Sequence, residues 1–174
     1  MRNIAHIIHN DKFTIDYVTF FQKYYSDYNH TFITVRGKYN FEQYKNSIIE
    51  MNTYKELFSK RIKKILQDSD KIIVSGLFDV NKYLFFLPNR ILKKAYLHFW
   101  GGDFYIFRDT KFFTKKRVHK FIEQSLIKRC NGIINLIDSD YQELSKIFPN
   151  TKKHFVGPFL SGKKDFEGRN KYFR

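Results

Sequence analysis

The segment from Tyr96 to Tyr105 holds the residue types best suited to bind and transform a ligand. An apolar stretch there ends at two glycines followed by a carboxylate, which is typical of a buried strand with polar groups at its carboxyl end. Open α/β sheets bind ligands at that edge, and glycines let a substrate approach the main chain. The side chains offer hydrogen bonds, a stacking surface and a base. The candidate residues are His98, Trp100, Gly101, Gly102, Asp103 and Tyr105.

An ordinary Gly-Gly-Asp turn with no ligand is the competing interpretation of this segment. Two further groups end other predicted strands, namely His9 and the Ser75-Gly76 pair. His9 at its strand's carboxyl end could line the same edge, although a single histidine there is more often a structural hydrogen-bonding residue. His6 and His9 lie three positions apart on a strand and therefore point to opposite faces, so we expect no shared metal site.

The predicted helix after this segment is rich in basic residues. At 100° per residue, one side carries Val118, Phe121, Ile122 and Ser125, with Leu126 at its margin, and is expected to face the sheet. The opposite side carries Phe113, Lys116, Arg117, Lys120 and Ile127. Aromatic and basic residues on an exposed face suit an anionic membrane surface. They also suit nucleic acid, and a merely solvated helix face is the third alternative.

The candidate site residues can act together only if secondary-structure elements place them at one edge of a sheet. Along the chain, short apolar runs alternate with helical patterns. Strands are predicted at residues 4–9, 31–35, 71–77, 96–99, 132–137 and 154–156. Helices are predicted at residues 14–26, 54–66, 80–87 and 114–129, with another that starts at 138 and ends before Pro149. Strands separated by helices pair in parallel, so the expected fold is α/β, a Rossmann-like doubly wound sheet. We expect one domain over residues 1–160 and a basic tail over 161–174.

Composition narrows the function further. The 174 residues carry a net charge of +15, which predicts a polyanionic neighbour. No stretch is apolar enough for a membrane span or a signal peptide, so a cytoplasmic location is expected. The single Cys130 excludes an internal disulfide and is expected to pack in the core. Neither a Gly-x-Gly-x-x-Gly nor a Walker sequence is present, which argues against a dehydrogenase or a kinase.

From Leu97 onward the sequence resembles the bacterial 4-alpha-L-fucosyltransferase family, glycosyltransferase family 56. The family motif His-x-Trp-Gly-[Ala/Gly]-Asp-[aromatic or Leu]-Tyr is matched by His98, Trp100, Gly101, Gly102, Asp103, Phe104 and Tyr105. A basic helix, an apolar strand and an acidic helix start follow in the family order. Its members transfer 4-acetamido-4,6-dideoxygalactose from a thymidine diphosphate sugar to a polyprenyl-linked saccharide of enterobacterial common antigen.

The resemblance implies the acceptor-binding, N-terminal half of a B-type glycosyltransferase. Asp103 would be the catalytic base, because the acceptor hydroxyl loses a proton as it attacks. Trp100 and Tyr105 would stack on sugars, and His98 would bind a hydroxyl or a diphosphate. His9, Gly101 and Gly102 would complete the substrate site.

The resemblance also implies the partners of the chain. They would be a nucleotide-sugar donor, a polyprenyl diphosphate-linked acceptor and the anionic cytoplasmic face of the inner membrane. Phe113, Lys116, Arg117 and Lys120 would contact that membrane. No metal and no cofactor are expected.

The family has two domains, so this chain is expected to be an incomplete half. It would need a second chain that supplies the donor domain, or it would be an inactive remnant. A basic nucleic-acid-binding module or an inactive interaction module is the alternative function.

Overall fold

A seven-stranded, all-parallel sheet forms the centre of the computed structural model, which describes residues 1–41, 44, 46–77, 79–105, 114–148 and 154–156. The spatial order is β3-β2-β1-β4-β5-β6-β7. The strands are β1 Arg2–Ile8, β2 Tyr28–Val35, β3 Ile48–Met51, β4 Lys71–Ser75, β5 Ala95–Phe99, β6 Gly132–Asn135 and β7 His154–Val156. The predicted doubly wound, Rossmann-like α/β fold is confirmed.

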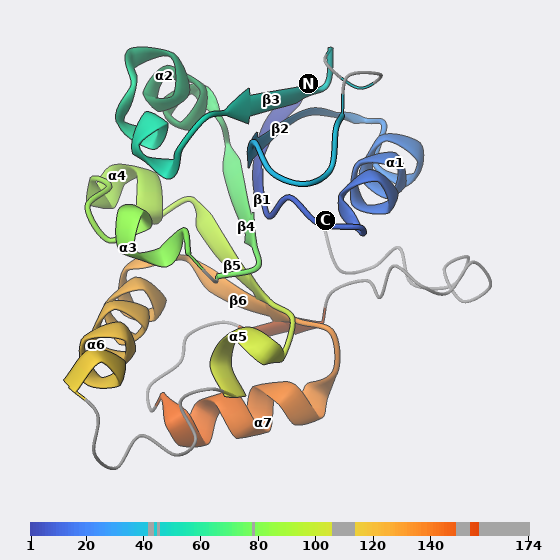
Figure 1. Cartoon of the computed structure of the whole chain (residues 1–174). Coiled ribbons are helices and arrows are strands. Elements are labelled where there is room, and N and C mark those ends of the chain that lie inside the picture. The colour runs from blue at the N-terminus through green and yellow to red at the C-terminus, as the bar shows by residue number, and fades with distance from the viewer. Residues whose placement is uncertain (42–43, 45, 78, 106–113, 149–153, 157–174) are drawn as a thin grey trace.

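Helices cover both faces of this sheet, and one face carries more helices than the other (Figure 1). They are α1 Thr14–Tyr24, α2 Lys60–Asp68, α3 Asn81–Leu84, α4 Asn89–Leu92, α5 Gly102–Tyr105, α6 Thr114–Arg129 and α7 Asp138–Ile147, with a 3₁₀ helix η2 at Tyr54–Phe58. Side chains of α1 pack on one face of the sheet, around Phe32 and Ile73. The other face packs around Leu97 and Phe99, against residues of α2, α3, α4, α6 and α7.

Most predicted elements are present with shifted ends, and three differences have a local cause. The predicted helix 54–66 is divided into η2 and α2, because the Ser59 side chain accepts a hydrogen bond from the Ile62 amide and caps a new helix there. The edge strand β3 is missing from the prediction, since its four residues are too few to show a period. The Gly-Gly-Asp turn continues into the one-turn helix α5.

The orientation predicted for α6 is wrong. Val118 and Phe121 are 56% and 63% exposed, whereas Ile127, expected on the outside, is buried. The buried stripe runs through Glu123, Leu126, Ile127 and Cys130, which follow the i, i+3, i+4, i+7 spacing of one helix face.

Arg129 fixes the end of α6. Its guanidinium donates to the carbonyl oxygens of Phe85 and Leu87 and to the Asn89 side chain, at 2.5 to 2.7 Å. These contacts tie α6 to the segment between α3 and α4 and to the start of α4.

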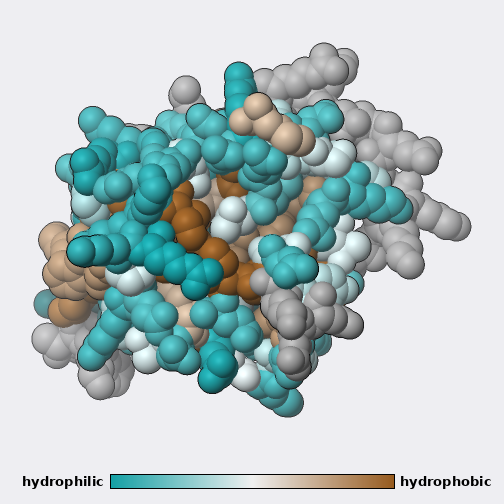
Figure 2. Space-filling view, turned by 90° about the horizontal axis from the view of Figure 1, so that it is seen from above, coloured by the Kyte–Doolittle hydropathy of each residue, from teal (hydrophilic) through white to brown (hydrophobic). Residues whose placement is uncertain are grey.

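On the face shown in Figure 2 the coloured surface is largely hydrophilic, with an apolar recess between hydrophilic side chains. Among the helices of the described residues, none is both long and apolar enough to cross a bilayer. The tail predicted at 161–174 lies outside the described residues.

Candidate functional site

A pocket of about 200 Å³ lies at the carboxyl ends of β1 and β4. The chain leaves β1 toward β2 and later leaves β4 toward β5 in the opposite direction, so this is the switch point where α/β folds bind ligands. The pocket is lined by Ile8, His9, Asp11, Phe13, Thr14, Tyr17, Ser75, Gly76 and Trp100. The structure thus brings together His9, the Ser75-Gly76 pair and Trp100, which sequence patterns singled out separately.

The loop between β1 and α1 is held in one shape by its own polar groups. The Thr14 hydroxyl donates to the His9 carbonyl oxygen at 2.7 Å and accepts from the Asp11 amide at 3.1 Å. The Asp11 carboxylate accepts from the Phe13 amide at 2.7 Å. The His9 ring lies 3.3 Å from the Tyr54 hydroxyl. A carboxylate and an imidazole are thereby placed at the pocket, although nothing in the sequence around Asp11 marked it as a site residue.

Trp100 forms an aromatic wall of the pocket. Its indole N–H donates to the Ser75 hydroxyl oxygen at 2.7 Å, which fixes the ring orientation. The centroid of the Phe13 ring is 5.9 Å from that of Trp100, and Phe13 is 40% exposed. Together the two rings offer an apolar platform beside the polar groups of the β1–α1 loop.

Buried hydrogen bonds beneath α1 reach the pocket at two of its lining residues, Ser75 and Tyr17. The Ser75 hydroxyl lies 3.1 Å from Nδ1 of His98. The Tyr17 hydroxyl is 3.0 Å from Nδ1 of His6. His6 and His98 are both buried, and His98 lies outside the pocket lining.

The backbone carbonyl of Tyr25 determines which atoms carry the protons in the hydrogen-bond chain that ends at Tyr17. Nε2 of His30 is 2.8 Å from the Tyr25 carbonyl oxygen, which can only accept, so Nε2 of His30 carries the proton. Nδ1 of His30 then accepts from Nε2 of His6 at 2.9 Å, and Nδ1 of His6 accepts from the Tyr17 hydroxyl. Burial lowers the pKa of His6 well below its ordinary value and also lowers the pKa of His30, so both rings are neutral at pH 7.

His98 is the ring next to Ser75, with its Nδ1 hydrogen-bonded to the Ser75 hydroxyl. Its second ring nitrogen is Nε2. That nitrogen is buried and has no hydrogen-bond partner in the described part of the chain. Burial lowers the pKa of His98 to about 4, which keeps the ring neutral.

Asp103 lies beside the pocket, where it joins two loops. Its carboxylate accepts from the amides of Leu77, at 3.2 Å, and Trp100, at 3.0 Å, and so connects the segments that follow β4 and β5. Burial raises the pKa of Asp103 to about 6, against the lowering effect of its hydrogen bonds from backbone amides. The side chain is 2% exposed and does not line the pocket. Its role as a catalytic base stays a prediction; the geometry shows a carboxylate that positions Trp100.

Tyr105 and Gly101 also lie outside the pocket lining. The Tyr105 hydroxyl donates to the Asp140 carboxylate of α7 at 2.6 Å. Gly101 has a φ of +90°, and a Cβ there would lie 3.3 Å from the Tyr105 ring. Gly102 has open space at the same position. Only Gly101 is therefore required by the backbone.

Glu123 is a buried carboxyl group that the sequence patterns missed. Its Oε1 accepts from the Asn81 amide at 2.5 Å, and its Oε2 is buried with no partner among the described residues. Burial raises the pKa of Glu123 to about 8, the Asn81 hydrogen bond lowers it and the nearby Asp103 carboxylate raises it. Its position on the buried stripe of α6 was the signal that could have found it.

The predicted membrane contacts are only partly within the described structure. Arg117 is exposed and Lys120 is half-buried, whereas Phe113 and the side chain of Lys116 lie outside the described residues. Among the described residues, no three His, Cys, Asp or Glu side chains are grouped as metal ligands.

The fold is that of a Rossmann-like α/β protein with a pocket at its topological switch point, the place where such folds bind ligands. Compared with protein-family models and with curated proteins, the chain gives no match. Its function is therefore argued from the chemistry of the pocket.

The two adjacent glycines provide a matched test of the local backbone. Gly101→Ala should lower the free energy of unfolding by about 1–3 kcal/mol, because alanine is strained at positive φ and meets the Tyr105 ring. Gly102→Ala should leave stability unchanged or raise it slightly, since it adds a helix-favouring residue in open space. Denaturant unfolding measures both; equal effects of the two substitutions would contradict this local structure.

The buried Glu123 predicts a pH dependence of stability. Its folded pKa of about 8 exceeds the ordinary 4.5, so the folded state binds more protons between these values and stability falls as pH rises through them. Between pH 7 and pH 8 the free energy of unfolding should fall by about 1 kcal/mol. The pKa values of His98 and Asp103, about 4 and about 6, lie below the range from pH 7 to pH 8. Glu123→Gln should remove the fall, whereas Glu143→Gln, at a surface ion pair with Lys146, should retain it.

Proposed function

We propose that this chain is the acceptor-binding part of a glycosyltransferase that moves a deoxyamino sugar from a nucleotide sugar to a polyprenyl diphosphate-linked glycan. The resemblance of the segment from His98 to Tyr105 to family 56 supports the reaction class. The pocket at the ends of β1 and β4 supports the assignment of the acceptor side, because its lining suits sugar hydroxyl groups.

The composition of the pocket is the observation that carries this proposal. Its polar lining consists of a carboxylate, an imidazole and hydroxyl groups, and no lysine or arginine is among the described residues that line it. Such a lining favours neutral hydroxyl groups over phosphate, although the whole chain carries a charge of +15. Trp100 and Phe13 add the aromatic platform on which the apolar face of a sugar packs.

The reaction needs a base near the acceptor hydroxyl. As the hydroxyl oxygen attacks the donor sugar, the bond to the nucleoside diphosphate breaks and the hydroxyl proton passes to a protein group. His9 and Asp11 line the pocket and are within reach of a bound hydroxyl. Asp103 would serve by holding Trp100 and the Leu77 loop in place, and it becomes the base only if both backbone hydrogen bonds open.

The contribution of the aromatic platform to binding can be tested with a matched control from the same chain. Phe13→Ala should weaken binding of a soluble short-chain prenyl diphosphate disaccharide by about fivefold, since an aromatic contact contributes on the order of 1 kcal/mol. Tyr24→Ala removes a similarly exposed ring at the far end of α1 and should leave binding unchanged. Isothermal calorimetry measures the affinities. No binding by the wild type, or equal losses in both variants, would remove the proposal.

We also propose that α6 rests on an anionic membrane. Arg117, Val118 and Phe121 are exposed on this helix, and Phe86, 72% exposed, lies close by. The ring of Phe85 contacts both Phe121 and Phe86, which connects the two exposed rings. Exposed rings beside a cation suit the headgroup region of a bilayer.

The membrane proposal predicts a loss of vesicle binding when the rings are removed. The double variant Phe86→Ser and Phe121→Ser should bind vesicles of phosphatidylglycerol and phosphatidylcholine at least about tenfold more weakly, because two apolar side chains stay in water. Tyr24→Ser, on α1, is the control and should bind as the wild type does. Co-sedimentation measures the bound fraction. Equal binding by all three proteins contradicts the contact, and salt-dependent retention on DNA without vesicle binding would favour a nucleic-acid-binding module.

A further inference from the structure

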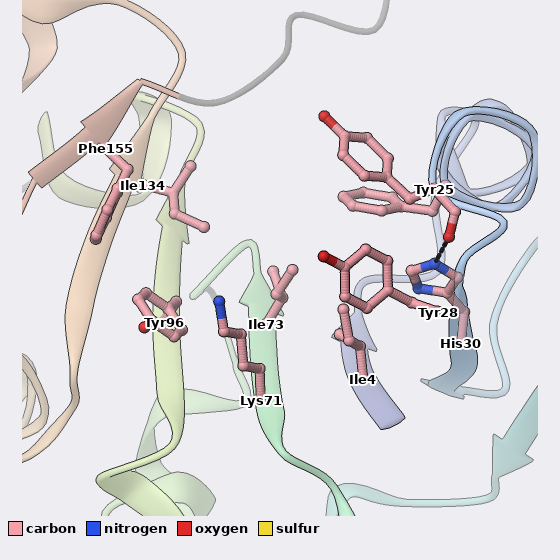
Figure 3. A pocket seen from close by; sticks show the side chains of 10 residues that line it. Ile4, Tyr25, Tyr28, His30, Lys71, Ile73, Tyr96, Ile134 and Phe155 are labelled. Atoms are coloured by element: carbon pink, nitrogen blue, oxygen red, sulfur yellow. Dashed lines mark hydrogen bonds between the residues drawn. The ribbon is translucent and has the colours of Figure 1, made fainter. Parts of the chain in front are cut away.

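A second pocket, of about 180 Å³, lies on the α1 face of the sheet, nearer the amino ends of the strands. Figure 3 shows the residues that line it. They are Ile4, Phe21, Tyr25, Tyr28, His30, Lys71, Ile73, Tyr96, Ile134 and Phe155. None of them lines the first pocket, so the two pockets are separate.

The second pocket is a slot between aromatic walls. Tyr25 and Tyr28 stand on one side, and Tyr96 and Phe155 on the other (Figure 3). The Tyr96 and Phe155 rings are in edge contact, with centroids 5.7 Å apart. Branched aliphatic side chains of β1, β4 and β6 complete the lining. A flat apolar body fits between such walls.

Lys71 gives the slot a single positive charge. Its ammonium group lies 5.7 Å from the centroid of the Tyr96 ring and projects into the slot. No carboxylate lines the pocket, and none in the described part of the chain pairs with Lys71. A half-buried cation with no carboxylate partner among the described residues attracts an anion more strongly than a solvated lysine does.

Two phenol groups complete the polar part. The hydroxyl groups of Tyr25 and Tyr28 are directed into the slot in Figure 3. Burial raises the pKa of Tyr25, and the neighbouring Tyr28 raises it further, so Tyr25 remains a neutral phenol. Neutral phenols and an ammonium group are all hydrogen-bond donors toward an anionic oxygen.

We propose that this second pocket binds a small amphipathic anion, a planar aromatic body of one or two rings with a carboxylate that pairs with Lys71. The site is independent of the proposed transferase function. It is connected to the first pocket, however, because His30 lines the slot and is linked through His6 to Tyr17, which lines the first pocket. A ligand in the slot would therefore lie next to the His30 ring, the first ring of this hydrogen-bond chain.

The test uses 2-naphthoate as the anionic probe and 2-naphthamide as its neutral counterpart. By calorimetry, the wild type should bind the naphthoate at least about tenfold more tightly than the amide, because only the anion pairs with Lys71. Lys71→Met should lose that preference, and Lys71→Arg should restore most of it. Lys60→Met, at an exposed lysine, is the control and should behave as the wild type. The NMR signals of the His30 ring should shift on binding.

Equal binding of the two probes by the wild type would overturn the proposal, as would unchanged naphthoate binding by Lys71→Met or no saturable binding at all. Ile134→Trp fills the slot and should abolish binding of both probes; retained binding would place the probes elsewhere and overturn the site. Lys71→Met should keep the binding of the prenyl diphosphate disaccharide to the first pocket. This comparison distinguishes a failure of the proposal for the second pocket from a failure of the proposal for the first.

Discussion

The hydroxyl group of Ser75 is the contact on which the arrangement of the carboxyl edge depends. It accepts the indole N–H of Trp100 and is hydrogen-bonded to Nδ1 of His98. The end of β4, the end of β5 and the loop that follows β5 thus meet at one oxygen atom. Since these groups are largely withdrawn from water, any movement that breaks the contact leaves several polar atoms unpaired. The position of Trp100, and with it the shape of the pocket, follows from that constraint.

The hydrogen-bond chain from the Tyr25 carbonyl to Tyr17 is directional because it begins at a carbonyl group. The Tyr25 carbonyl can only accept, so the protons of His30, His6 and Tyr17 are ordered one after another. Burial keeps the rings neutral, which is the state that this order requires. Helix α1 is thereby registered on the sheet by polar contacts as well as by its apolar side chains. The two pockets on this face are joined by the same chain of bonds.

On the opposite face, buried carboxyl groups support the same edge. Asp103 connects the segments after β4 and β5, and Glu123 holds Asn81 of α3 against α6. Both carboxyls have raised pKa values because burial disfavours their charged forms. These two buried carboxyl groups thus stabilise the segments that follow the strands at the carboxyl edge. Asp11 and His9, by contrast, line the pocket itself. The proposed acceptor site would need this separation, because the groups that bind a hydroxyl must be accessible and those that position them must not move.

The sequence by itself determined the doubly wound parallel sheet, since apolar runs of strand length alternate with helical periods, and α6 and α7 begin at the predicted residues, 114 and 138. It also identified the Gly-Gly-Asp break and the strand ends at His9 and Ser75, because strands of one direction must end at one edge. Only the tertiary structure decided which side chains face the pocket. Asp103 turned inward to backbone amides while Asp11 stayed at the opening, and Phe121 and Ile127 exchanged the sides expected for them. Spacing along a helix shows which residues share a face, but packing against the whole sheet selects the face that is buried.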